Sequence, residues 1–201
     1  MKTSNLSRIA LAVALAVPVA SMAGSDITTT LGAGSVSANV NLDFRIIIPN
    51  FVFLQVGTGT LLADNAAIDT VEWTPSVAQL GTGSIAASTP AVTARIIGNN
   101  GAITINSSTP GALSNGAGDT IAYTEISATS SDFAHPPFAA SGAGPTPTVT
   151  VPNVIPGRVT DLTATWTFSW ANATVVPAGT YGDITNSGLN NSRVTYTASM
   201  P

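Results

Sequence analysis

The hydrophobic residues of this chain recur with a period of two, which is the period of β-strands rather than of helices. Residues 162–172, LTATWTFSWAN, place Ala164, Trp166, Phe168 and Trp170 on one face and Thr163, Thr165, Thr167 and Ser169 on the other. Residues 36–48, VSANVNLDFRIII, alternate in the same way. Each pattern predicts a strand with one buried face. We therefore expect the following aromatic residues in the core: Phe44, Trp166, Phe168, Trp170 and Tyr196.

Other strands are predicted in AVTARII, AITIN, DTIAYTEISA, TPTVTV and SRVTYTASM, which Gly, Pro, Asn and Ser clusters separate. The turn GNNG between the first two predicts a hairpin, in which Gly98 and Gly101 supply positive φ. The best helix candidate, residues 65–73, is short and serves equally well as a loop. The fold class expected is all-β, an antiparallel β-sandwich of Ig-like or jelly-roll type, as a single domain over residues 24–201. Residues 131–148 are expected to form a surface loop within it.

The first 23 residues have the layout of a secretory signal peptide. Lys2 and Arg8 precede an apolar run over residues 9–19, and Ser21 and Ala23 are the small residues of a cleavage site. The apolar run is shorter than the roughly 20 residues that span a bilayer. We expect export, with passage through the periplasm to the cell surface or the medium.

Charge limits the partners of the mature chain. Without residues 1–23, four arginines face ten acidic residues, which gives a formal net charge of −6. Such a surface repels nucleic acid and anionic lipid headgroups, so we expect neither as a partner. No membrane span is expected either, because Pro49 and Asn50 interrupt the apolar stretch FRIIIPNFVFLQVG. The chain has no cysteine, so burial and backbone pairing must hold the fold.

The residues that catalysis or metal binding needs do not group along this chain. His135 is the only histidine, and without cysteine or a second imidazole it completes neither a zinc site nor a nucleophile–base pair. We expect it to be a solvated loop residue. The sequence predicts no enzyme activity, no cofactor and no metal. The tryptophans of residues 162–172 could form a sugar-stacking platform, but sharing a face with Ala164 and Phe168 favours the core.

The export signal, the acidic Thr-, Ala-, Gly- and Asn-rich all-β composition, SVSANVNLDF near the mature N-terminus and RVTYTASMP at the other end together resemble fimbrial subunits of Gram-negative bacteria. The resemblance is to the chaperone/usher type and to its cysteine-free branches. It implies self-association or assembly with homologous subunits, a periplasmic chaperone and an outer-membrane usher as partners, and adhesion to a glycan.

In that family an extension of one subunit completes the sandwich of the next by β-strand addition. The resemblance implies a donor segment over residues 24–34, with Ile27 and Leu31 as its anchoring side chains. The alternation changes phase between Gly32 and Ser35, so residues from Val36 onward are expected to pair in the subunit's own sheet. Two alternatives remain open: the N-terminal strand pairs within its own chain, or the protein is a stand-alone secreted carbohydrate-binding or adhesion module.

The signal peptide makes a direct prediction. The exported protein should begin at Gly24 and contain no lysine, because Lys2 leaves with the leader. Mass spectrometry of the exported protein measures this, and a peptide containing Lys2 in the secreted fraction would show that the segment is retained.

Overall fold

The computed structural model describes residues 24–140, 144–152, 158–183 and 189–201. The chain divides into two parts, Met1–Ile48 and Pro49–Pro201. The expected signal peptide, residues 1–23, lies outside the described residues.

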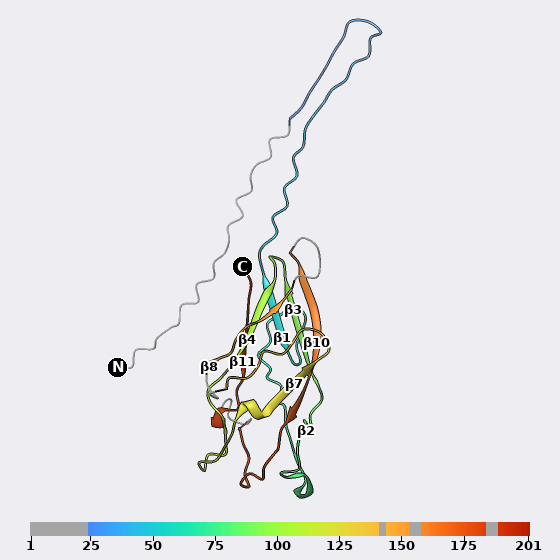
Figure 1. Ribbon diagram of the computed structural model, residues 1–201. Helices are drawn as coiled ribbons and strands as arrows, with labels where there is room; N and C mark the ends of the chain where they lie inside the picture. The colour runs from blue at the N-terminus through green and yellow to red at the C-terminus, as the bar shows by residue number, and fades with distance from the viewer. Residues whose placement is uncertain (1–23, 141–143, 153–157, 184–188) are drawn as a thin grey trace, which may run out of the picture. The chain divides into compact units, whose positions relative to one another are not determined.

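Residues 49–201 form an all-β domain with antiparallel strands, as predicted (Figure 1). The strands are β1 (Val52–Val56), β2 (Ile85–Ala86), β3 (Val92–Gly98), β4 (Ile103–Thr109), β5 (Leu113–Ser114), β6 (Thr120–Ile121), β7 (Ile126–Ser130), β8 (Gly144–Pro145), β9 (Val149–Val151), β10 (Thr160–Trp170) and β11 (Thr195–Ser199). Helix within the described ranges is limited to three short 3-10 turns, η1 (Val77–Gln79), η2 (Tyr123–Glu125) and η3 (Leu189–Asn191). The helix candidate over residues 65–73 has no regular structure.

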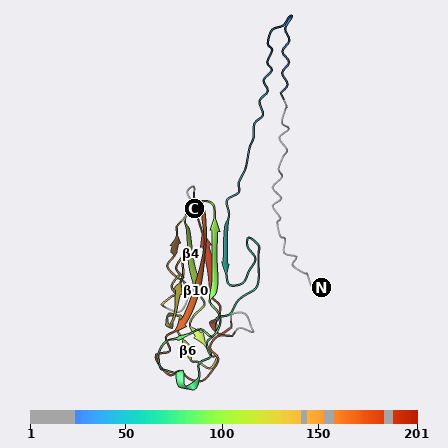
Figure 2. The ribbon, with the colours of Figure 1, turned by 90° about the vertical axis from the view of Figure 1, so that its right-hand side faces the viewer.

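Two sheets make up the sandwich. The first has the order β1-β3-β10-β2, and β7 also pairs with β10. The second has the order β11-β4-β8, and β9 also pairs with β4. The short strands β5 and β6 form a separate ribbon. The longest strand, β10, runs along the domain in both views (Figures 1 and 2).

The core lies between the sheets, and β10 shows how its sequence produces it. Ala164, Trp166, Phe168 and Trp170 are buried, and the threonines between them are exposed, which confirms the predicted facing. Trp166 is fully enclosed, and its indole N–H donates to the Phe133 carbonyl at 3.2 Å. Trp170 donates to the Glu125 carboxylate at 3.1 Å. Both indole N–H groups thus have the partner that burial requires.

The predicted hairpin at GNNG is wrong, because β3 and β4 belong to different sheets. Each strand carries a buried apolar row, Ala94 and Ile96 on β3 and Ile103 and Ile105 on β4. These rows are better buried facing each other across the core than side by side in one sheet. Gly101 has φ +117°, whereas a Cβ on Gly98 would lie 2.8 Å from the Ile103 side chain. The role of Gly98 is therefore to let the two sheets pack closely, and not to supply a positive φ.

Residues 131–140 do not form the free surface loop that we expected. Phe133, Pro136 and Ala139 are buried, and Phe133 packs edge-on against Trp166 with the ring centroids 5.7 Å apart. Thr146, later in the expected loop, is also buried, and its hydroxyl donates to the Ser107 carbonyl. The apolar residues of this Pro-rich stretch therefore complete the core.

The strand predicted over residues 36–48 is absent, and so is the core position of Phe44. Residues 24–48 are exposed and form no strand, and Phe44 is 87 % exposed. An alternating sequence makes a strand only where another strand supplies main-chain hydrogen bonds, and no described strand of this chain pairs with these residues. Tyr196, by contrast, packs against the core from β11.

The packing of β10 predicts that substitutions at two adjacent residues lower the free energy of unfolding by very different amounts. Trp166→Ala should lower the free energy of unfolding by roughly 3 to 5 kcal/mol, because it leaves a cavity in the core. Thr165→Ala, on the exposed face, should cost about 0.5 kcal/mol or less. Urea unfolding of the two variants measures the difference, and similar costs would contradict the facing of β10.

Candidate assembly surface

Residues 24–48, considered by themselves, fold back in a long turn. The chain reverses over residues 31–33, where Gly32 has φ +116°, a value that favours glycine. The backbone N–H of Asn39 donates to the Asp26 carboxylate at 3.0 Å, which links the two arms. Ile27 and Leu31 lie on the first arm and are fully or nearly fully exposed.

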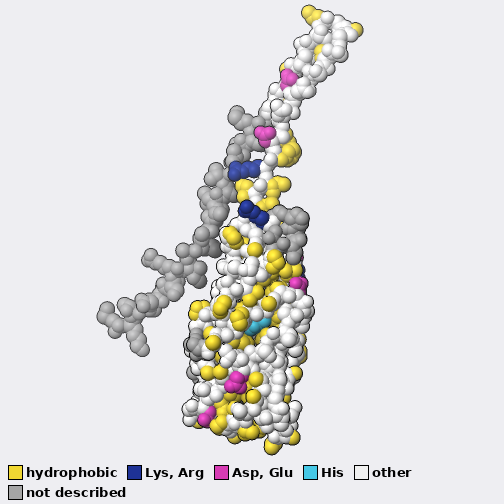
Figure 3. Space-filling view, viewed as in Figure 1, with side chains coloured by type: hydrophobic (Ala, Val, Ile, Leu, Met, Phe, Trp, Pro, Cys, Tyr) yellow, Lys and Arg dark blue, Asp and Glu magenta, His cyan; other side chains and the backbone are white. Residues whose placement is uncertain are grey.

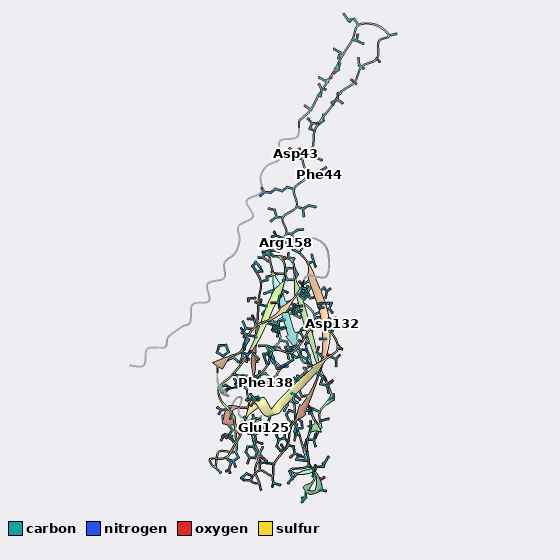
Figure 4. The ribbon with its side chains drawn as sticks, in the orientation of Figure 1. Asp43, Phe44, Glu125, Asp132, Phe138 and Arg158 are labelled. Atoms are coloured by element: carbon teal, nitrogen blue, oxygen red, sulfur yellow. The ribbon has the colours of Figure 1, made fainter. Side chains whose placement is uncertain are left out.

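The second arm, residues 36–48, carries an uncovered row of apolar side chains. Its even positions are Val36, Ala38, Val40, Leu42, Phe44, Ile46 and Ile48, and all are exposed. The intervening positions from Ser37 to Arg45 are polar or charged. Figure 3 shows hydrophobic side chains along this part of the chain, and Figure 4 labels Phe44 and its polar neighbour Asp43. An exposed apolar row of this length is typical of a surface that another protein surface covers.

Asn99 fixes the backbone where the domain begins. Its amide oxygen accepts the Phe51 N–H at 3.0 Å, and its amide nitrogen donates to the Pro49 carbonyl at 2.7 Å. These bonds use the backbone groups on both sides of Asn50, just before β1. They oppose a tight hairpin at residues 49–51, which is the shortest route for residues 36–48 to pair with β1 of the same chain.

The outer strands of both sheets are paired on one side only among the described residues, and two of these edges, β1 and β11, lie close to each other. Among the described strands, β1 pairs only with β3 and β11 pairs only with β4, and β1 contacts β11. The inward side chains of both edge strands are only partly buried although they pack against the core, namely Leu54, Val56, Tyr196, Ala198 and Met200. Such edges can accept a further strand through their unpaired main-chain groups.

His135 is half-buried against β11 and Trp166, and not the solvated loop histidine that we expected. Its Nε2 lies 2.8 Å from the Tyr196 hydroxyl. The centroid of its ring is 4.8 Å from those of Phe138 and Trp166 and 5.3 Å from that of Phe168. Figure 3 shows the histidine among hydrophobic side chains. The sequence signal for this burial was the apolar company of His135 in FAHPPF.

Burial determines the protonation of this cluster. It lowers the pKa of His135 to about 4, because the imidazolium would lose its hydration among apolar rings. Burial likewise raises the pKa of Tyr123 to about 12 and raises that of Tyr196 further. The imidazole and both phenols are therefore neutral at pH 7.

The described residues offer little for other kinds of site. A depression beside β1 and β3 is lined by polar and small residues such as Thr58, Asp69 and Thr93, with no aromatic ring for a sugar to stack on. The Asp69 carboxylate already accepts from the Thr58 backbone and hydroxyl. No cluster of metal-ligating side chains occurs in the described ranges. Over the same ranges no helix has the length and apolar character to cross a membrane.

Comparison of the chain with family models, with curated proteins and with solved structures finds no match, so the geometry and the sequence pattern carry the functional argument.

The buried imidazole predicts acid sensitivity of the fold. The pKa of His135 is about 6.5 when unfolded and about 4 when folded, so between these values the unfolded chain binds the extra proton. Stability from this group is complete above pH 6.5 and falls toward pH 4, by roughly 3 kcal/mol in total at 1.36 kcal/mol per unit of pKa shift.

Urea unfolding at pH 7 and pH 4.5 measures this loss, with His135→Phe as the matched variant that keeps a ring but cannot titrate. The wild-type chain should lose roughly 2 to 3 kcal/mol more than the variant over this range. Equal losses in the two proteins would place His135 in solvent.

Proposed function

We propose that this chain is a secreted structural subunit of a surface filament, assembled by β-strand addition. In this proposal residues 36–48 of one copy pair with the open edge of β11 in a second copy. The observation that carries it is the uncovered apolar row of residues 36–48, together with a β11 strand that the described strands pair on one side only.

The donor segment has the chemistry that strand addition requires. Its backbone can pair with an edge strand along its whole length, because it contains no proline before Pro49. Its apolar row can point into the core of the acceptor, while polar side chains such as Asn41 and Asp43 remain in water. At about 3.3 Å per residue, thirteen residues extend about 43 Å, which exceeds the length of β10.

The acceptor edge complements this donor. β11 alternates exposed Thr195, Thr197 and Ser199 with the partly buried Tyr196 and Ala198, so an added strand would meet apolar neighbours on its inner face. Of the two adjacent edges β1 and β11, β1 is flanked by its own chain, since Gln55 bonds to the Gly57 carbonyl and packs near Gly59. We therefore assign β11 as the acceptor.

A second copy of this chain is the occupant that the arrangement favours. Each copy carries one donor and one acceptor, so pairing them gives a head-to-tail contact that repeats into an open filament. The bonds of Asn99 to Pro49 and Phe51 disfavour pairing with the same chain. The earlier arm, with only Ile27 and Leu31, is a weaker donor than the seven-residue row, so the donor moves from residues 24–34 to residues 36–48.

Export and assembly partners complete the proposal. The predicted signal peptide directs the chain to the periplasm, where the apolar row needs protection until a second subunit accepts it. A periplasmic chaperone would supply that protection, and an outer-membrane usher would set the order in which subunits are added. Homologous subunits could accept the same donor. Binding of the filament to a glycan would make it adhesive.

A pair of adjacent substitutions tests the proposal. Leu42→Asp places a charge on the apolar row and should abolish polymers, because a buried carboxylate lacks a partner in the acceptor core. Asn41→Asp adds the same charge on the polar row and should still polymerise. Sedimentation and negative-stain microscopy of the purified full-length proteins compare the two.

A peptide of residues 36–48 provides the complementary measurement. It should bind the Leu42→Asp protein and raise its melting temperature, since that variant keeps an empty acceptor edge. A wild-type chain that stays monomeric at high concentration, with no peptide binding, would overturn the filament. Glycan binding by such a monomer would support a stand-alone adhesion module instead.

A further inference from the structure

His135 connects the two sheets beneath the edge that we assign as the acceptor. Its ring packs against Trp166 and Phe168 of β10, and its Nε2 meets the Tyr196 hydroxyl of β11 at 2.8 Å. Tyr196 also packs directly against Trp166, with the ring centroids 5.5 Å apart. Figure 4 labels Phe138, the further ring against His135, which comes from the same loop.

The imidazole of His135 has a hydrogen-bond partner on β11, the Tyr196 hydroxyl, which lies 2.8 Å from Nε2. In a neutral ring with its proton on Nδ1, Nε2 is an acceptor and the Tyr196 hydroxyl donates to it. This bond ties the residue 131–140 loop to β11.

We propose that His135 is the positioning residue of the acceptor edge: through Tyr196 it holds β11 ready for strand addition only while its imidazole is neutral. This inference rests on the proposed function, because it concerns how the acceptor edge of that function is regulated. β11 is paired on one side only, so its inward contacts contribute more to holding it than they would in a central strand.

Protonation would reverse this bond and place a cation among the rings. A proton from solvent adds to Nε2, Nε2–H then donates to the Tyr196 oxygen, and the hydroxyl hydrogen turns away into apolar surroundings. The new cation faces rings from β10, β11 and the loop. The titratable groups near it are Tyr196 on β11 and Tyr123 on η2, both neutral, and Tyr123 already donates to the Asn191 carbonyl.

No nearby carboxylate compensates the cation among the residues that the structure describes. Glu125 on η2 accepts from Trp170, and Asp132, three residues before His135, is exposed. Figure 4 labels both residues. The uncompensated charge is relieved if β11 moves away from the core and water enters, so acid should loosen the acceptor edge first.

Amide hydrogen exchange tests this in the full-length Leu42→Asp protein, which should be monomeric. Thr195–Ser199 should exchange by a local opening, with protection at least tenfold below that of Val92–Gly98. After correction for intrinsic exchange rates, this protection should fall at least tenfold from pH 7 to pH 4.5, while protection of Val92–Gly98 follows the global stability. His135→Phe should abolish the fall in protection of Thr195–Ser199 between the two pH values. Tyr196→Phe, which removes only the hydroxyl, should lower β11 protection already at pH 7.

A merely structural histidine would leave Thr195–Ser199 exchanging only by global unfolding, with the same protection as Val92–Gly98 at both pH values, and that result would overturn the proposal, as would unchanged protection of β11. Peptide binding separates this failure from failure of the proposed function. Affinity for the peptide of residues 36–48 should fall at least tenfold over the same pH range in the protein with His135 and little in the His135→Phe variant. A peptide that binds at no pH would reject strand addition, while the exchange data would still decide the role of His135.

Discussion

A β-strand at the edge of a sheet leaves half of its main-chain hydrogen-bonding groups without a protein partner, and this constraint shapes the whole molecule. β1 and β11 are among the strands that the described domain pairs on one side only, and residues 36–48 have the alternation of a strand but pair with no described strand. The edge strand has unpaired main-chain groups, and so does the segment. Strand addition between copies, as we propose it, would pair the two with the same hydrogen bonds.

The core that supports these edges depends on burial, since the chain has no cysteine to cross-link it. Trp166 is fully enclosed at the centre, as are Ile96, Ile103 and Ile105, whereas Leu54, Ala198 and Met200 near β1 and β11 are only partly covered. The domain is therefore complete enough to fold around its centre. Its coverage decreases toward the side where we place the added strand.

Much of the fold was predictable from local pattern, because alternation on β10 records which side chains face the core. The same signal was misleading for residues 36–48, since alternation reports that a strand will be half buried and not in which chain its partner lies. The sequence also did not reveal that β3 and β4 lie in different sheets. The spacing of GNNG suits a hairpin, but Gly98 instead allows close packing against Ile103. His135 was misassigned because its Pro-rich surroundings suggested a surface loop, although the apolar residues of FAHPPF were a sign that this segment packs against the core.

The absence of cysteine makes disulfide trapping the most direct measurement of donor exchange. Two single-cysteine proteins would be mixed. The donor protein would carry Val40→Cys, Leu42→Cys or Phe44→Cys, and the acceptor protein would carry Ala198→Cys on β11. Our account predicts a disulfide between different chains for at least one donor position, and none for Asn41→Cys, whose side chain lies on the outer row. No disulfide at any donor position, or an equal yield with Asn41→Cys, would contradict it.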